Sequence, residues 1–263
     1  MNTVIQEKLC SVDSAKSELD SMRPLPPNTV ASLREKLSLE WTYNSNAIEG
    51  NTLTLRETKV VLEGITVGGK SLREHFEAIN HRDAILYVED LVAEQEPLSE
   101  WQIKNIHGLV LRGVDDGAAG RYRCENVVIA GASTVPPDFL HLDEEMRGLI
   151  EWYEEADQLH PIERASELHA RFVEIHPFID GNGRTGRLLM NLELMKAGYP
   201  PAVIRKEDRL GYYDALDEAC VSKNYDAITG LVVEAVQRSI NTYQEVLQHD
   251  PDYAPSSGPK FGM

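Results

Sequence analysis

The sequence HPFIDGNGRTGR, residues 176–187, decides how the rest of this chain is interpreted. Apolar residues at helical spacing lead up to it over residues 162–175, and Pro177 predicts that this helix ends at the start of the stretch. A second apolar stripe follows over residues 185–197 and stops at a glycine and two prolines. The pattern predicts two buried helices that flank a short glycine-rich turn.

The residue types in this turn are those of an anion-binding site. Glycines let successive backbone N–H groups converge, and the N-terminus of the second helix adds partial positive charge. Arg184 and Arg187 lie three residues apart, so we expect them to grip a polyphosphate from one face of the helix. Asp180 offers a hard oxygen ligand for Mg²⁺, and His176 offers a base that is mostly neutral at pH 7. Together they predict attack of a hydroxyl group on a phosphate. The alternative is a buried histidine beside an ordinary glycine-rich turn.

The stretch resembles the Fic motif, His-Pro-Phe-x-Asp/Glu-Gly-Asn-Gly-Arg-x-x-Arg, at every defined position. The similarity extends from about Thr42 to Tyr213 and is to the group of Fic proteins that have an N-terminal inhibitory helix. The resemblance implies an all-α fold, a helical bundle with a small β-hairpin flap. It also implies a protein adenylyltransferase, which moves AMP from ATP to a Ser, Thr or Tyr hydroxyl of a target protein.

The resemblance also implies roles for single residues. His176 is the expected base, Asp180 the expected Mg²⁺ ligand, and Gly183 stands where phosphate-transferring relatives have Lys. Cys220 stands where close relatives have an Asn that helps to bind the base. The implied nucleotide-binding residues are Asp180, Gly181, Asn182, Gly183, Arg184, Thr185, Gly186 and Arg187 in the motif, Ala130, Gly131, Ala132 and Ser133 in the flap, and Tyr212 and Tyr213 near the adenine.

Residues 125–134 are the one segment that does not carry a helical pattern. A β-branched run followed by glycine, and then by Pro136 and Pro137, predicts a short hairpin. In the Fic family this hairpin is the flap, and an extended edge can pair with a segment of the target protein. An ordinary surface hairpin is the alternative.

The sequence SNAIEG, residues 45–50, predicts the end of a helix, with Gly50 just beyond it. A glutamate in the last turn of a helix is unfavourable for the helix dipole unless a cation faces it. The segment resembles the family's inhibitory motif, Ser-x-x-x-Glu-Gly, which implies that Ser45 and Glu49 are inhibitory residues. In that interpretation Glu49 pairs with Arg187 in the place of the γ-phosphate. The same carboxylate is a candidate for positioning a water that removes AMP from a modified target.

A competing motif is GITVGGKS, residues 64–71, which matches the P-loop pattern of an ATPase. A P-loop follows a buried strand, whereas the preceding residues carry a helical capping box from Thr54 to Glu57. The alternative is a loop between two helices. A further possibility is a non-catalytic module that binds a partner in a nucleotide-dependent way.

Composition limits the classes of partner and the cellular location that we expect. Acidic side chains outnumber basic ones by 43 to 26, giving a formal net charge of −17, so we expect neither nucleic acid nor a membrane as partner. Three cysteines and no recognisable signal peptide predict a cytoplasmic protein with reduced thiols. The family resemblance adds a homodimer as an expectation.

The sequence predicts a single main domain. We expect an N-terminal helical segment over residues 1–30, a Fic core over 31–248 whose inhibitory helix ends near residue 50, and a mobile tail over 249–263. Further helices are predicted over residues 72–93, 99–112, 143–156, 209–221 and 225–247.

Overall fold

The computed structural model describes residues 2–248, and these residues form ten α-helices and three short 3₁₀ turns. The predicted tail over residues 249–263 lies outside the described residues. The helices are α1 (Thr3–Ser21), α2 (Pro27–Ile48), α3 (Leu55–Leu62), α4 (Leu72–Ala93), α5 (Glu100–Leu111), α6 (Leu142–Glu155), α7 (Pro161–Ile175), α8 (Asn182–Lys196), α9 (Arg209–Ser222) and α10 (Asp226–Gln248). The predicted all-α class is therefore confirmed, and α4 has the bounds expected from the sequence.

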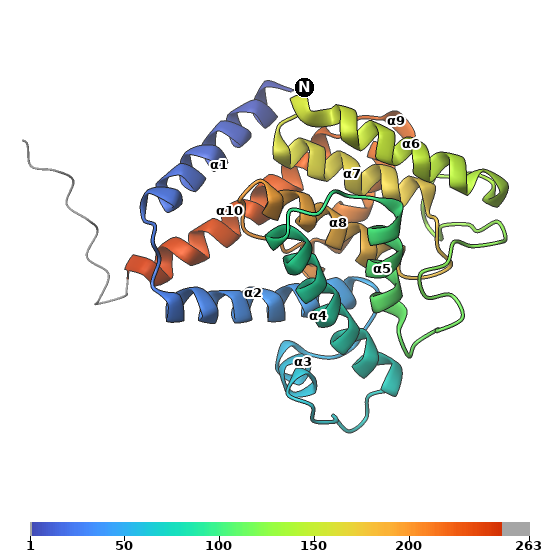
Figure 1. The fold of residues 1–263 in the computed structure, drawn as a ribbon, viewed down its shortest axis with the longest axis horizontal. Helices are drawn as coiled ribbons and strands as arrows, with labels where there is room; N and C mark the ends of the chain where they lie inside the picture. Colours follow the sequence, from blue (N-terminus) through green and yellow to red (C-terminus); the bar gives the residue numbers. More distant parts are fainter. Residues whose placement is uncertain (1, 249–263) are drawn as a thin grey trace, which may run out of the picture.

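Helices α7 and α8 form the centre of the molecule, with α2 and α4 on one side and α6 on the other (Figure 1). Helix α8 is buried around its whole circumference, because it contributes to two apolar clusters at once. Leu188 and Leu192 pack in one cluster with α4, α5 and α6, while Met190 and Leu194 pack in the other with α1, α9 and α10. The helix that starts at the glycine-rich turn is thus held rigidly from all sides.

The N-terminal segment is not separate from the rest of the fold. Helix α1 packs on α10, and its buried residues Leu9 and Val12 belong to the same cluster as Met190 of α8. The expected boundary at residue 30 falls inside α2, which begins at Pro27 with proline at its first position. In the described part of the chain, no helix is both long and apolar enough to span a bilayer.

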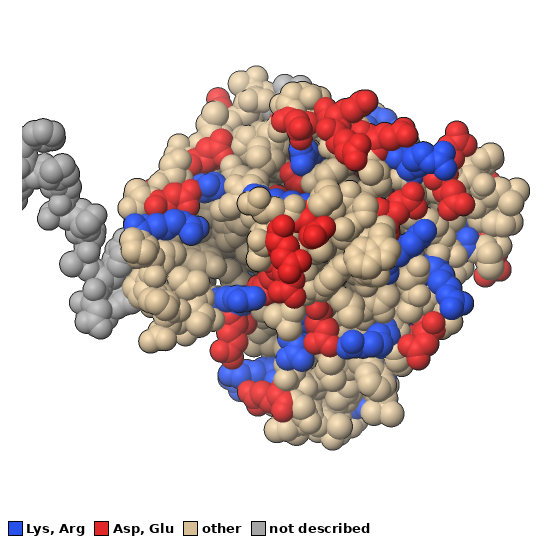
Figure 2. Space-filling model, in the orientation of Figure 1, with Lys and Arg blue, Asp and Glu red and all other residues tan. Residues whose placement is uncertain are grey.

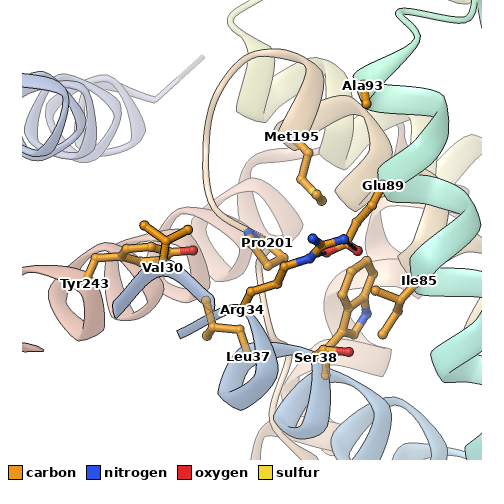
Figure 3. Close-up of a pocket in the computed structure, with 11 residues that line it drawn as sticks. Val30, Arg34, Leu37, Ser38, Ile85, Glu89, Ala93, Met195, Pro201 and Tyr243 are labelled. Atoms are coloured by element: carbon orange, nitrogen blue, oxygen red, sulfur yellow. Dashed lines mark hydrogen bonds and ion pairs between the residues drawn. The ribbon is translucent and has the colours of Figure 1, made fainter. Parts of the chain in front are cut away.

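Helix α2 is fixed to α4 along its N-terminal half. Arg34 Nε donates to Glu89 Oε1 at 2.8 Å, and its Nη2 pairs with the other carboxylate oxygen. Figure 3 shows this pair at a cavity of about 320 Å³ between α2, α4 and α10, whose lining includes Leu37 and Tyr243. None of the residues that line this cavity belongs to the stretch 176–187.

The prediction of a β-hairpin over residues 125–134 is wrong, because none of the described residues lies in a strand. The expected turn does form: Ala132 N donates to Ile129 O at 3.3 Å, and Gly131 adopts a φ of +82°. The two arms beside the turn, however, do not pair with each other.

The physical reason is that most N–H groups of one arm are either bonded elsewhere or absent. The carboxylate of Asp217 on α9 accepts the N–H groups of Ser133 and Thr134, at 2.9 and 2.8 Å. Pro136 and Pro137 follow, and proline carries no N–H. A side chain of α9 therefore binds the backbone of one arm in the place of a partner strand.

Charged side chains are spread over the surface rather than separated by sign. On the face drawn in Figure 2, Lys and Arg side chains lie beside Asp and Glu side chains. Ion pairs between exposed side chains include Lys8–Glu234. The arginines of the motif differ from these, because Arg184 and Arg187 are each only 2% exposed. The positive charge that the sequence predicted for an anion site is thus an interior charge.

Helix α2 ends as the sequence predicts. Glu49 caps the helix, Gly50 follows with a φ of +97°, and two backbone hydrogen bonds close the end: Gly50 N to Ala47 O at 3.1 Å and Asn51 N to Asn46 O at 3.0 Å. This is the Schellman arrangement, in which a left-handed residue satisfies the last carbonyl groups of a helix.

We predict that Gly50→Ala lowers the free energy of unfolding by about 1 kcal/mol, because alanine is strained at this positive φ. Gly148→Ala is the matched control, since a Cβ at either position meets no atom within 4 Å and Gly148 lies inside α6. Removing a glycine from a helix interior should instead raise stability by roughly 0.5–1 kcal/mol. Urea denaturation of both variants measures the difference, and equal effects would contradict the conformational explanation.

Candidate active site

His176 lies directly after α7, at the point where the helix ends. Its backbone is left-handed (φ +48°, ψ +56°), which is unusual for a residue other than glycine and is typical of functional sites. Its ring Nδ1 lies 3.3 Å from Val173 O, and because a carbonyl oxygen only accepts, Nδ1 carries the proton. The other ring nitrogen, Nε2, is therefore the basic one.

The environment keeps the ring of His176 neutral. Burial lowers the pKa of His176, and the nearby guanidinium group of Arg123 lowers it further. The carbonyl of Val173 and the carboxylates of Glu49 and Asp180 act in the opposite direction but do not cancel the effect. A neutral imidazole with a free Nε2 can accept a proton at pH 7.

The turn between α7 and α8 is locked by its own side chains. Asn182 Oδ1 accepts from Phe178 N at 3.0 Å, and Asn182 Nδ2 donates to Phe178 O at 2.8 Å. Gly181 precedes α8 with a φ of +80°. Because of this lock, α8 begins at Asn182, three residues earlier than predicted, and Gly183 belongs to the first helical turn rather than to a free loop. The N–H groups available at this turn are therefore those of a helix start and not those of a glycine nest.

A buried histidine supports this turn from below. His107 Nε2 donates to Asp180 O at 2.9 Å, and His107 Nδ1 accepts from Gly120 N at 2.9 Å. The ring stacks on Phe178 with centroids 3.5 Å apart, and a Cβ at Gly181 would lie 3.3 Å from it. The shape of the turn thus depends on a residue of α5.

The guanidinium group of Arg187 is held by the C-terminal end of α2 and by Tyr212 of α9. Its Nε donates to Ser45 Oγ at 3.0 Å, and its Nη2 donates to Ser45 O at 2.9 Å and to Glu49 Oε1 at 2.8 Å. Its Nη1 donates to Tyr212 Oη at 3.1 Å, and that hydroxyl lies 2.8 Å from His169 Nε2. Arg187 is thereby aimed at the C-terminal end of α2, where Glu49 supplies the negative charge that faces it.

The end of α2 has a second contact with α9. Tyr213 Oη donates to Ile48 O at 3.1 Å. Tyr212 is fully buried against Arg187 and His169. Both tyrosines that the sequence placed near the adenine therefore contact the end of α2 directly or through Arg187. Both of them line the same cavity as His176.

Arg184 faces a different group of acidic residues. Its Nη2 donates to Asp180 Oδ1 at 3.2 Å, and its Nη1 lies 3.5 Å from Glu77 Oε1. Asp180 Oδ2 accepts from Arg73 Nη2 at 2.6 Å, and Asp180 Oδ1 accepts from Gly181 N. Burial alone would raise the pKa of Asp180, but Arg184, the Gly181 amide and Arg73 together lower it. The two arginines of the motif therefore bind different acidic residues and do not face one common site.

The glycines at positions 183 and 186 of the motif allow close packing. A Cβ at Gly183 would overlap Glu49 Oε1, and one at Gly186 would overlap the ring of His169. Thr185 is fully buried, and its Oγ1 has no hydrogen-bond partner among the described residues. Gly183 makes room for a carboxylate or phosphate at the helix start, whereas Gly186 makes room for the helix α7.

One cavity of about 520 Å³ is lined both by His176 and by Gly183 of the first turn of α8. This volume lies within the usual range for small-ligand sites. The sequence-predicted residues that line it are Glu49, Ala130, Gly131, Ala132, His176, Gly183, Arg187, Tyr212 and Tyr213. Those that do not line it are Ser45, Ser133, Asp180, Gly181, Asn182, Arg184, Thr185 and Gly186. Cys220 lines it as well, and burial raises the pKa of its thiol to about 11.

Arg123 connects the loop beside the cavity to His176. This guanidinium group donates through Nε to His176 O at 3.0 Å, through Nη1 to Glu125 O at 2.9 Å, and through Nη2 to Pro137 O at 2.5 Å. Arg123 N also donates to Pro177 O at 2.9 Å. One buried side chain therefore fixes both ends of the loop and the backbone of His176.

Residues 64–71 do not form a phosphate-binding loop. They connect α3 to α4, and helix precedes them as the capping box predicted. Lys70 Nζ donates to Thr52 O at 2.6 Å, and Ser71 Oγ accepts from Glu74 N at 3.2 Å as the N-cap of α4. Each residue of the apparent motif that could bind phosphate has a structural task instead.

Four residues of the site were missed by reasoning from the sequence: His107, Arg123, His169 and Asp217. His107 and His169 had a local signal, because each lies on the buried and mostly apolar face of its helix. Arg123 and Asp217 act on the site from a loop and from α9, so their role depends on contacts between distant segments.

Comparison with known proteins assigns this arrangement to a family. Residues 97–194 match the Fic/DOC family model. The chain is 38% identical to protein adenylyltransferase Fic from Nematostella vectensis over 247 residues, which are 90% of this chain and 56% of that protein. It is 35% identical to protein adenylyltransferase fic-1 from Caenorhabditis elegans over 223 residues, 83% of this chain and 43% of that protein. The chain spans about half the length of these curated relatives.

A solved structure gives the same result over most of its length. Fic-1 (aa134–508) from C. elegans superimposes with a TM-score of 0.85 at 31% identity, covering 93% of this chain and 73% of that one. A Fic domain containing signaling protein from Bacteroides thetaiotaomicron superimposes with a TM-score of 0.79 at 29% identity, covering 90% and 97%.

We predict that the protein loses stability as the pH falls from 6.5 to 5. Burial lowers the pKa of His107 to about 4 and that of His169 to about 3, and it lowers the pKa of His81 well below its ordinary value. The unfolded chain therefore binds more protons than the folded chain in this window, so stability rises with pH across it. Each histidine contributes up to about 1.4 kcal/mol per pH unit.

His81→Leu removes one of these titrating groups, so the slope of unfolding free energy against pH should fall by the contribution of about one bound proton. The substitution breaks no hydrogen bond, because neither ring nitrogen of His81 has a partner among the described residues. The measurement is urea denaturation at several pH values. His141→Gln, which removes an exposed imidazole, is the control. A slope that His81→Leu leaves unchanged would contradict the prediction.

Proposed function

The chain belongs to the Fic/DOC family, and from this membership we propose that it is a protein adenylyltransferase that moves AMP from ATP to a hydroxyl side chain of a target protein. One observation carries the proposal: His176, whose ring is neutral, and the N-terminal turn of α8 line the same cavity. A base and an anion site side by side are what a hydroxyl needs to attack a bound phosphate.

In the proposed reaction the triphosphate lies at the start of α8, against Gly183 and Arg187. His176 Nε2 accepts the proton of the attacking hydroxyl group. A bond forms between the hydroxyl oxygen and the α-phosphorus, the bond from the α-phosphorus to the bridging oxygen breaks, and pyrophosphate leaves. Arg123 holds the carbonyl of His176 in place, so the imidazole keeps its orientation while the proton moves.

We propose that Mg²⁺ arrives with ATP and that Asp180 is its protein ligand. Asp180 Oδ2 is bonded to Arg73, whose side chain is 58% exposed and can turn aside. Among residues 2–248 there is no cluster of three or more His, Cys, Asp or Glu able to hold a metal alone, so phosphate oxygens and water would complete the shell. When bound, the ion would neutralise charge on the phosphates.

We propose that Glu49 inhibits this reaction. Its carboxylate occupies the outer face of Arg187, 2.8 Å from Nη2, and fills the space that the missing side chain of Gly183 leaves. A γ-phosphate at the same place would meet a negative charge and an occupied guanidinium group. ATP then binds only in a non-productive way until α2 shifts.

The target protein is expected to dock on the loop over residues 125–137. Val128 at its outer arm is 91% exposed, and this arm has no strand partner within the described chain, so its backbone is open to pairing with an extended segment. We propose Ser, Thr or Tyr as the modified residue, a homodimer as the assembled form and the cytoplasm as the location.

Removal of AMP is a second candidate activity of the same site. Glu49 and His176 line one cavity, and a carboxylate there is suited to orient a water toward a modified hydroxyl. Incubation of an AMP-modified target with the wild-type chain tests this, and release of AMP that Glu49→Gly abolishes would establish it.

We predict that Glu49→Gly raises AMP incorporation into the chain itself by about 10- to 100-fold, because a charged hydrogen bond to Arg187 is lost. Mass spectrometry after incubation with ATP and Mg²⁺ measures the incorporation, and a mass increase of one phosphate instead would indicate kinase chemistry. Glu63→Gly is the matched control, since Glu63 caps α3 and precedes a glycine of positive φ in the same way. Equal labelling of both variants and the wild type would exclude the brake.

We predict that His176→Ala, made in the Glu49→Gly background, lowers the rate of transfer by about 10²- to 10⁴-fold, as expected for loss of a general base. Lys70→Ala in the same background should leave the rate unchanged, because Lys70 is bonded to Thr52 outside the site. The opposite pattern, with Lys70 essential and His176 dispensable, would favour the ATPase interpretation. Initial rates with labelled ATP measure both.

A further inference from the structure

The loop over residues 125–137 is held at two places that have different chemistry. At its base, Arg123 binds the carbonyl groups of Glu125 and Pro137, and Asn126 Nδ2 donates to Asp138 Oδ2 at 2.9 Å. These contacts join parts of the loop to each other and to His176. They do not fix where the tip lies relative to α9.

The tip is fixed by one carboxylate on α9. Asp217 Oδ1 accepts from Ser133 N at 2.9 Å, from Thr134 N at 2.8 Å and from Thr134 Oγ1 at 2.6 Å, and Asp217 Oδ2 accepts from Ser133 N at 2.9 Å. The side chain of Thr134 and the amide of Ser133 are the main reasons that the pKa of Asp217 lies below its ordinary value. The carboxylate is therefore charged at neutral pH.

This contact closes one wall of the cavity. The loop supplies Ile129 and the residues of its turn, α9 supplies Leu216 and Cys220, and Thr134 and Asp217 line the cavity where the two walls meet. Since no strand ladder stiffens the loop, the separation of these walls depends on the bonds to Asp217.

We propose that Asp217 is a positioning residue that latches the tip of the loop onto α9 and so sets the width of the nucleotide pocket before ATP binds. This inference rests on the proposed function. A loop that is already in place loses no conformational freedom when the nucleotide enters, so binding is tighter than to a free loop. The latch also places the outer arm, around Val128, for the target protein.

Both oxygens of the carboxylate face the N–H group of Ser133. Asparagine lacks the negative charge and has one acceptor oxygen, and its NH₂ group would face the backbone N–H of Ser133. Asp217→Asn should therefore release the tip, while Thr134→Val removes a single donor and keeps the shape of the side chain. Glu218→Gln is the matched control, because Glu218 is the next residue of α9 and is bonded to Asn224 rather than to the loop.

The experiment is made in the Glu49→Gly background with three readouts. Amide hydrogen exchange of Ser133 and Thr134 reports the latch directly, calorimetry reports the dissociation constant for ATP, and initial rates separate KM from kcat. For Asp217→Asn we expect about tenfold faster exchange at both amides and about tenfold weaker ATP binding, with kcat changed less than KM. Thr134→Val should give a smaller effect that disappears when it is combined with Asp217→Asn.

Unchanged exchange in Asp217→Asn would overturn the latch, and faster exchange with unchanged ATP affinity would overturn its positioning role. The exchange and calorimetry readouts do not require AMP transfer. If the Glu49→Gly chain transfers no AMP while Asp217→Asn still loosens the loop and weakens ATP binding, the proposed function fails and the latch stands.

Discussion

The buried guanidinium group of Arg187 is the constraint on which the site depends. A buried charge is costly unless its donors are satisfied, and here the acceptors come from α2 and α9, with His169 of α7 behind Tyr212. The group therefore couples the positions of three helices. Glu49 completes the set of acceptors around Arg187, so under the proposed function an incoming phosphate must offer comparable bonds.

Two further side chains extend this arrangement outward. Arg123 joins the backbone of His176 to both ends of the loop, and Asp217 joins the tip of that loop to α9. The walls of the cavity are thus set by charged groups that bind backbone atoms, not by apolar contacts. Such contacts define direction as well as distance, which suits a site where a hydroxyl and a phosphate must meet in line.

The sequence predicted most helices because apolar periodicity and capping residues are local signals, as the ends of α2 and α4 show. It also predicted His176, Arg187 and Glu49, which the structure brings to one cavity. It failed where a distant side chain competes with local pairing: the hairpin is absent because Asp217 takes the donors of one arm. It also placed Arg184 beside Arg187, although acidic residues of α4 and the turn draw Arg184 away.

The absence of a side chain at Gly183 has a consequence for how this position tolerates change. The space next to its Cα is occupied by the carboxylate of Glu49, and under the proposed function a phosphate would need the same space. A side chain at this position would displace the carboxylate. Under the proposed function, regulation and nucleotide binding therefore constrain the same residue, so a substitution of Gly183 would alter both together.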